Sequence, residues 1–251
     1  MSLASNNNLT ASEFSALLKD NNFDFVDFGC GIGGSMQQAK HEFFGLRGLG
    51  LDICEKKVTD AKAAGYDAAC VNILTLPIMP KSCRFVMISH FLEHLNSTKD
   101  AAIMIRNAIA LAEDFVYIQQ PYFDADGLLF QEGYKLYWSD WHGHPNQMTS
   151  LEFHNILNRF LKEELITRFI ICAKNQIKRA SHPAILPIDT PMDQQSYDGS
   201  IHLPKQAQIL PFRYPVYDEI RVLIETGNSK IIDDCIPISR SKKVLFDSKY
   251  T

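Results

Sequence analysis

The chain contains 251 residues, of which 46% are hydrophobic and 22% charged, and this composition predicts a globular protein built as one large domain. Its net charge of −4 argues against a nucleic-acid partner, because such partners need a broad basic face and the basic clusters here are short. No stretch reaches the roughly 18 uninterrupted apolar residues of a membrane span, and the N-terminus lacks a signal-peptide pattern, so no membrane partner is expected.

The six cysteines are scattered along the chain without a Cys-x-x-Cys pair. This distribution is typical of buried thiols in a reducing compartment. It favours a cytoplasmic location over a disulfide framework or a cysteine zinc site. The sequence gives no indication of the oligomeric state.

The first half of the chain alternates between helical and strand patterns. A capping box at Thr10-Ala-Ser-Glu13 opens the first helix. Apolar runs that predict strands follow at 23–29, 46–53, 66–73, 84–90 and 114–121, and helical spacing separates them at 34–44, 54–65 and 101–112. Strands that alternate with helices predict an α/β fold with a parallel sheet and helices on both faces.

The second half departs from this alternation. Residues 121–148 are rich in aromatic residues and glycine, and we expect them to form a lid or substrate loop. A second capping box opens a helix at Thr149, and two further strands are expected at 165–174 and 217–225, with a proline-rich insert at 177–211. We expect a single domain over 1–251, composed of a cofactor-binding half at 1–120, the loop at 121–148, a C-terminal sheet half at 149–226 and a tail at 227–251.

A glycine-rich loop, Gly29-Cys-Gly31-Ile-Gly33-Gly34, follows the first predicted strand. Glycines let the backbone turn tightly and approach a ligand whose anionic end faces the next helix. The spacing also satisfies the dinucleotide fingerprint, and Asp52 lies near the distance expected for a ribose-binding acid. On these residues alone, a nicotinamide-dependent oxidoreductase stays a full alternative.

Two polar positions shift this choice. Asp27 stands two residues before the first glycine, where a dinucleotide fold usually carries an apolar residue. A carboxylate there can hold the amides of the loop or, through water, an ammonium group. The third predicted strand ends in Asn72-Ile73, which can offer a side-chain amide and a backbone amide to an adenine edge.

Four segments in this order resemble those of class I S-adenosylmethionine-dependent methyltransferases, particularly the methyltransferase-11-like group. They are FVDFGCGIG (25–33), GLGLDI (48–53), VNI (71–73) and FVMISHFLEHL (85–95). The resemblance covers about residues 20–160 of the printed sequence. It implies a Rossmann-like sheet of seven mostly parallel strands whose last strand is antiparallel, S-adenosylmethionine as the cofactor, and methyl transfer as the activity.

The resemblance also implies roles for particular residues. The Asp52 carboxylate is expected to bind both ribose hydroxyls, with Ile53 against the adenine. The full set of expected cofactor-binding residues is Asp27, Gly29, Cys30 through its backbone, Gly31, Gly33, Asp52, Ile53, Asn72, Ile73, Ser89 and His90. The sequence departs from the family at Cys83-Arg84-Phe85, where the fourth strand usually begins with an aspartate after an aromatic residue.

The stretch His90-Phe-Leu-Glu93-His94 has the spacing of a helical zinc site with a glutamate base. That interpretation needs a long helix and a third ligand, whereas residues 87–90 indicate a strand. His142-Gly-His144 could supply further ligands on paper. We nevertheless expect no metal, and a structural hydrogen bond for His94.

The methyl acceptor is expected above the strand tips, where ligands sit in open α/β sheets. Tyr122, Trp138 and Trp141 are the expected substrate residues, and His142 or His144 is the expected general base because an imidazole titrates near neutral pH. The expected acceptor is a small-molecule or sugar-like compound with a hydroxyl or an amine. An NAD-dependent oxidoreductase and a non-catalytic cofactor-binding interaction module are the alternatives.

Overall fold

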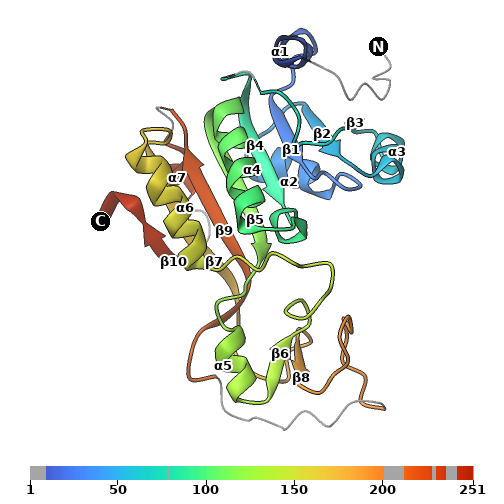
Figure 1. The fold of residues 1–251 in the computed structure, drawn as a ribbon, viewed down its shortest axis with the longest axis vertical. Helices are drawn as coiled ribbons and strands as arrows, with labels where there is room; N and C mark the ends of the chain where they lie inside the picture. The colour runs from blue at the N-terminus through green and yellow to red at the C-terminus, as the bar shows by residue number, and fades with distance from the viewer. Residues whose placement is uncertain (1–9, 79, 201–211, 228–229, 236–241, 251) are drawn as a thin grey trace.

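The computed structural model describes residues 10–78, 80–200, 212–227, 230–235 and 242–250. Its first half forms the parallel strands that the sequence predicts, namely β1 (Phe25–Phe28), β2 (Gly48–Asp52), β3 (Asp67–Cys70), β4 (Cys83–Ser89) and β5 (Ala112–Pro121). β1 pairs in parallel with β2 and β4, while β3 and β5 extend the sheet on either side (Figure 1). All residues of β1 are buried, as expected for a parallel strand covered on both faces.

The later strands run in both directions. They are β7 (Arg168–Ile177), β9 (Val216–Glu225) and β10 (Lys242–Asp247). β9 is antiparallel to both β5 and β7, and β10 is antiparallel to β7. Among the described residues these strands form an eight-stranded sheet in the order β10-β7-β9-β5-β4-β1-β2-β3. The predicted fold class is confirmed, including the reversed strand near 217–225, and the strand beyond the expected seven is β10 from the C-terminal tail.

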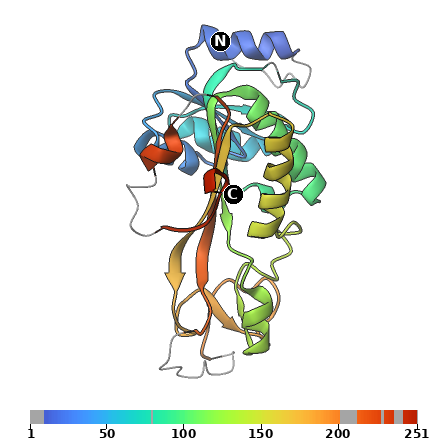
Figure 2. The same ribbon diagram turned by 90° about the vertical axis from the view of Figure 1, so that its left-hand side faces the viewer.

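Helices cover the two faces of the sheet in separate groups (Figure 2). One face carries α1 (Ala11–Asp20), α4 (Thr98–Leu111) and α6 (Ser150–Lys162). The opposite face carries α2 (Gly34–Glu42), α3 (Glu55–Ala63) and the short α7 (Ile231–Cys235). Both predicted capping boxes are present, at the start of α1 and of α6.

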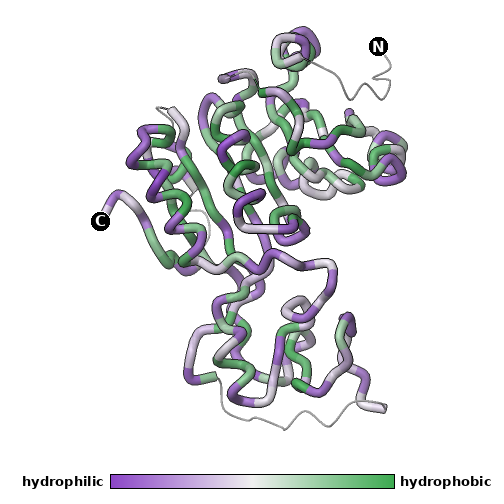
Figure 3. The backbone as a smooth tube through the Cα atoms, in the orientation of Figure 1, coloured by the Kyte–Doolittle hydropathy of each residue, from purple (hydrophilic) through white to green (hydrophobic). Residues whose placement is uncertain are grey.

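The alternation of side chains along each strand divides the core between these faces. Val26 and Phe28 pack on the side of α1, α4 and α6. Phe25 points to the side of α2 and α3, where its ring stacks on that of Phe85 with centroids 4.9 Å apart. Figure 3 shows the hydrophobic segments running along the central strands and polar segments on the outer helices.

A smaller lobe lies beyond the carboxyl ends of the parallel strands (Figure 1). It contains α5 (Asp126–Gln131), β6 (Tyr134–Leu136) and β8 (Ile185–Pro187), and β6 pairs with β8 in a two-stranded antiparallel sheet. The segment expected to form a lid or substrate loop, 121–148, contains a helix and a strand of its own. The proline-rich insert at 177–211 supplies the partner strand. Within the described ranges, no helix has the length and apolar character needed to cross a membrane.

The C-terminal tail is anchored to the sheet by a buried arginine. The guanidinium of Arg168 donates from Nε and Nη2 to the two carboxylate oxygens of Asp247, at 3.0 and 2.7 Å. Its Nη1 also donates to Asp233 at 2.7 Å. Burial raises the pKa of Asp247, but the hydrogen bonds and charge of Arg168 outweigh that effect and hold the pKa below its usual value.

Replacement of the buried carboxylate tests this anchor. We expect Asp247→Asn to lower the free energy of unfolding by about 2–4 kcal/mol, because the Arg168 charge then stays buried without its main partner. Urea denaturation at neutral pH measures the change. The difference from wild type should shrink as the pH falls through the depressed pKa of Asp247, because the native carboxylate is then protonated in both states.

Asp67→Asn is the matched control, because Asp67 pairs with Arg47 through a similar bidentate contact with both side chains more than 40% exposed. An exposed pair of this kind contributes less than about 1 kcal/mol. Equal decreases in the free energy of unfolding of Asp247→Asn and Asp67→Asn would show that Arg168 does not anchor the tail.

Candidate active site

The glycine loop between β1 and α2 adopts a backbone that side chains would disrupt. Gly29 and Gly33 have φ values of 77° and 100°. A Cβ atom on Gly29 would lie 2.3 Å from the Phe91 ring, and one on Gly33 would lie 2.3 Å from the Tyr66 ring. The loop is therefore packed directly against Tyr66 and against Phe91, which lies two residues after the end of β4.

Asp52, at the end of β2, is joined to this loop by a hydrogen bond. Its Oδ2 accepts from the backbone N–H of Gly31 at 3.0 Å, and its Oδ1 accepts from the N–H of Cys54 at 2.9 Å. The Cys30 side chain is buried, and this burial, with the charges of Asp27 and Asp52, raises the pKa of its thiol to about 12. The two motifs that the sequence singles out thus meet, and the thiol beside them is unreactive.

Asp27 lies at the centre of the sheet below the same loop. It is fully buried, and the Ser35 hydroxyl donates to its Oδ2. Its Oδ1 has no hydrogen-bond partner among the described residues. Burial raises the pKa of Asp27 to about 7, with the charge of Asp52 adding to the effect and the Ser35 hydrogen bond opposing it.

The residues that follow β2 and β3 differ in exposure and in hydrogen bonding. Ile53 is 70% exposed and offers apolar surface beside Asp52. The Asn72 side-chain oxygen instead accepts from the backbone N–H of Leu74 at 3.1 Å, which forms a turn, and Ile73 is buried. The side-chain oxygen of Asn72 therefore has a local structural role as well as the position that the sequence predicts.

Ser89 ends β4, and His90 follows it with an unusual backbone. His90 has a φ of 50°, in the left-handed region that residues other than glycine seldom adopt and that occurs at functional sites. Its ring Nε2 lies 3.0 Å from the Gln119 amide nitrogen, and its Nδ1 lies 3.4 Å from a Glu93 carboxylate oxygen. Burial lowers the pKa of His90, but Glu93 and then Glu219 outweigh it, so the net shift is upward.

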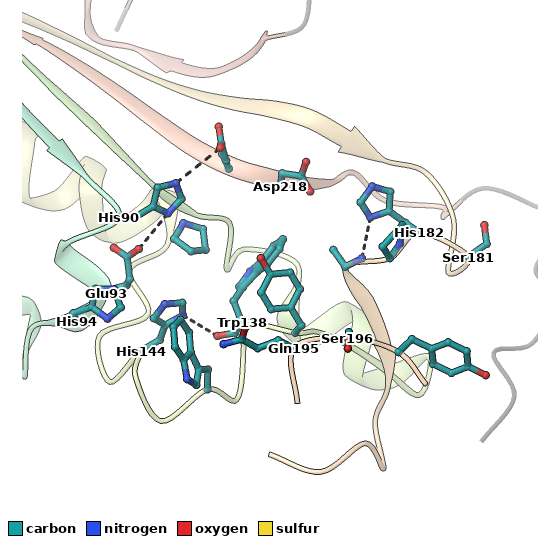
Figure 4. A pocket seen from close by; sticks show the side chains of 17 residues that line it. His90, Glu93, His94, Trp138, His144, Ser181, His182, Gln195, Ser196 and Asp218 are labelled. Atoms are coloured by element: carbon teal, nitrogen blue, oxygen red, sulfur yellow. Dashed lines mark hydrogen bonds and ion pairs between the residues drawn. The ribbon is translucent and has the colours of Figure 1, made fainter. Parts of the chain in front are cut away.

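A cavity of about 900 Å³ separates these strand ends from the lobe. The side chains that line it include Trp141 and, labelled in Figure 4, His90, Glu93, His94, Trp138 and His144. Glu93 and His94 belong to a short 3-10 turn, η1 (Leu92–His94), directly after β4. The predicted residues Trp138, Trp141 and His144 are thus brought together with the end of β4.

Two other predicted residues lie outside this cavity. Tyr122 is 4% exposed and packs edge-on against Tyr217. His142 is exposed, and its Nδ1 lies 2.6 Å from an Asp193 carboxylate oxygen. The spacing of aromatic and histidine residues in the sequence does not show which of them face inward, because neighbouring loop residues point in different directions.

The wall of the cavity also contains a pair of acidic residues that no sequence motif indicated, Asp218 and Glu219. They stand near the start of β9. Because β9 is antiparallel to β5, its first residues lie at the carboxyl ends of the parallel strands. The signal was present in the sequence, since a reversed strand that opens with two acids places them at the ligand-binding edge.

A sheet of this order, with a glycine loop after its first strand and an acid at the end of its second, defines a Rossmann-like methyltransferase fold. Solved structures share this fold at low sequence identity. A SAM-dependent methyltransferase from Archaeoglobus fulgidus is 16% identical, with 86% of this chain and 94% of that chain covered and a TM-score of 0.54. The YcgJ protein from Bacillus subtilis is 14% identical, with 86% of this chain and 99% of that chain covered and a TM-score of 0.52.

A possible histamine N-methyltransferase from Thermotoga maritima is 11% identical, with 81% of this chain and 82% of that chain covered and a TM-score of 0.50. None of the curated proteins matches the sequence. Residues 26–110 match the family model described as a methyltransferase domain. The chain thus has the fold of class I S-adenosylmethionine-dependent methyltransferases, and the matched segment contains the glycine loop and Asp52.

The protonation of Asp27 can be measured directly. We expect the Asp27 carboxyl to titrate near pH 7 in a carbon-13 NMR experiment on the protein without cofactor. Ser35→Ala should raise this pKa further, because it removes the hydrogen bond that stabilises the carboxylate. Ser12→Ala, at an exposed serine of α1, is the control and should leave the titration unchanged.

The same pKa has a consequence for stability. Asp27 holds a proton in the folded state from its ordinary pKa of 3.8 up to about 7, whereas the unfolded chain releases it. The Asp27 contribution to the free energy of unfolding should therefore fall as the pH rises through this window. Asp27→Asn should remove that decline, and an unchanged decline in the variant would contradict the assignment.

Proposed function

We propose that this methyltransferase transfers the methyl group of S-adenosylmethionine to a hydroxyl or an amine of a small-molecule, sugar-like acceptor held in the cavity. The observation that carries the proposal is the shared wall between the glycine loop and the cavity. Phe91 packs on Gly29, and its neighbour His90 lines the cavity. A cofactor over the loop would therefore have the acceptor on the other side of the same turn.

The cofactor is proposed to lie across the ends of β1, β2 and β3. The backbone of the glycine loop approaches its amino-acid part, and the unpartnered oxygen of Asp27 is available to its ammonium group through water. Asp52 holds the ribose hydroxyls with the lone pairs that its two backbone hydrogen bonds leave free, and exposed Ile53 packs on the adenine. The remaining proposed contacts are Gly29, Cys30, Gly31, Gly33, Asn72, Ile73, Ser89 and His90.

In the methyl-transfer reaction the main role of the protein is to align the acceptor with the methyl group. The methyl group sits on a cationic sulfonium, so it is already an electrophile. A lone pair on the acceptor forms the new bond to the methyl carbon while the carbon–sulfur bond breaks, and the sulfur keeps that electron pair in S-adenosylhomocysteine. The acceptor's proton leaves to a base or to water. Holding the two reactants in line and excluding competing water supplies the acceleration.

The wall of the cavity suits a polar acceptor of modest size. A volume of about 900 Å³ is at the upper end of small-molecule sites. Trp138 and Trp141 provide rings against which the apolar face of a sugar or an amine can pack. Asp218 and Glu219 provide acceptors for its hydroxyl or ammonium hydrogens.

Cofactor binding provides the first test. Titration calorimetry should show binding of S-adenosylmethionine and S-adenosylhomocysteine and none of NAD. We expect Asp52→Ala to weaken cofactor binding by about 1.5–3 kcal/mol, because a charge-assisted contact to the ribose is lost. Asp60→Ala, at an exposed acid on α3, is the matched control. Wild-type affinity in Asp52→Ala, or tighter binding of NAD, would contradict the proposed cofactor site.

The acceptor cavity needs a separate test, in which formation of S-adenosylhomocysteine is measured with a panel of sugars and small amines. We expect His144→Gln to reduce turnover at least about tenfold while cofactor affinity is retained, because His144 lines the cavity and lies away from the glycine loop. His142→Gln should keep wild-type turnover, since its ring faces Asp193. The reverse ranking of the two variants would place the acceptor elsewhere.

A further inference from the structure

Three side chains with metal-ligating atoms gather in the wall of the cavity. They are Glu93 and His94, from the turn after β4, and His144, from the loop of the lobe (Figure 4). One ligating atom from each lies within 4.8 Å of those of the other two. The segments that carry them are about 50 residues apart in the chain, so the fold creates the cluster.

Glu93 is the least ordinary member of this group. Glu93 is 0% exposed, and neither of its carboxylate oxygens accepts a hydrogen bond from any described residue. The His90 ring nitrogen is 3.4 Å from one oxygen, without hydrogen-bond geometry. A buried carboxylate without hydrogen bonds is costly, and buried charges are normally paired or bound to a metal. The His90 ring can pair with Glu93 when it is protonated, but both carboxylate oxygens keep lone pairs without a hydrogen bond, which are free to bind a cation.

Both histidines are held as metal-binding histidines usually are. Nδ1 of His94 lies 2.6 Å from the Gly143 carbonyl oxygen, and Nδ1 of His144 lies 3.1 Å from the Trp138 carbonyl oxygen. A carbonyl only accepts, so Nδ1 carries the hydrogen in each ring and the lone pair is on Nε2. Donation of one ring N–H to a backbone carbonyl is the usual support for an imidazole whose other nitrogen binds a metal.

A further residue fixes the two segments to each other. The Asn146 backbone N–H donates to the Glu93 carbonyl at 3.2 Å, and its side-chain amide donates to the Leu92 carbonyl at 2.9 Å. The Trp141 ring also packs edge-on against both His94 and His144. The relative positions of the three ligating side chains are thus set by the fold and not by their own flexibility.

We propose that Glu93, His94 and His144 bind a zinc ion whose remaining coordination position faces the acceptor cavity. Two imidazole nitrogens and one carboxylate oxygen form a common ligand set of catalytic zinc, which leaves a fourth position open. Mg²⁺ and Ca²⁺ prefer oxygen ligands only and fit this set poorly. Zinc takes its ligands at about 2.0–2.2 Å, and side-chain atoms that lie within 4.8 Å of one another can reach this spacing by small movements.

This site differs from the zinc pattern in the sequence and replaces the expectation that no metal binds. The pattern pairs His90 with His94 on one helix. In the structure His90 precedes a single 3-10 turn and His94 ends it, and the proposed ligands are Glu93 and His94 from this turn and His144 from the lobe. If the proposed function holds, the open position takes a hydroxyl, amine or carboxylate group of the acceptor and orients it for methyl transfer.

Zinc content tests the site without any methyl acceptor. The full-length protein is dialysed against Zn²⁺, freed of loosely bound ions, and analysed by mass spectrometry for bound metal. We expect about one zinc per chain, and binding at least about tenfold weaker in Glu93→Gln and His94→Gln. His142→Gln, in the same loop as His144 but turned toward Asp193, should bind zinc like wild type.

His94 is exposed, so we expect the His94→Gln variant to fold. Thermal unfolding can confirm that it does. A wild-type protein without zinc, or wild-type zinc binding in folded His94→Gln and Glu93→Gln, would overturn the proposal. Zinc binding in a protein that transfers no methyl group to the panel of sugars and amines would leave the metal site standing and remove only the proposed acceptor.

The fourth coordination position, which the proposal leaves open toward the cavity, can be tested separately. Co²⁺ replaces zinc in such sites and has visible absorption bands that depend on its ligands. Addition of azide should change the bands of the Co²⁺-loaded protein, because azide can occupy a free position on the ion. Absence of any change would mean that the protein closes the coordination sphere, and it would overturn the part of the proposal that gives the acceptor access to the metal.

Discussion

The close contact between Gly29 and Phe91 is the constraint on which the site depends. Because residue 29 has no side chain, the Phe91 ring fills the space where a Cβ would lie. This contact holds the turn after β4 against the glycine loop. The same turn supplies His90, Glu93 and His94 to the cavity. A single packing contact therefore sets the distance between the glycine loop and the cavity.

Local patterns in the sequence were sufficient to predict the central sheet. Each strand from β1 to β5 is an apolar run followed by a helical pattern, and both signals depend only on neighbouring residues. The strands β8 and β10 have no such signal. β8 is three residues long within a proline-rich insert, and β10 is a six-residue strand within the C-terminal tail, where no strand pattern was recognised. Their pairing with β6 and β7 comes from tertiary contacts that a pattern along one segment does not contain.

The candidate site likewise has a part that local sequence motifs predict and a part that only the tertiary structure brings together. Asp52 and the glycine loop were recognised from short local motifs, and the structure joins them by the hydrogen bond between Asp52 and Gly31. The cavity is assembled from the turn after β4, the lobe and the start of β9. His142 and His144 are two residues apart, yet only His144 reaches it. Which loop residue faces inward depends on the backbone path, which the sequence does not reveal.

The position of β10 bears on how the protein is made. β10 covers the edge of β7, and the chain reaches it only after all the other strands of the sheet have been synthesised. Until then, a ten-residue strand has unpaired backbone groups along one side. Such an edge can pair with a neighbouring chain. The growing polypeptide thus carries an open edge on β7 until residues 242–247 have left the ribosome, and a variant without these residues would keep it.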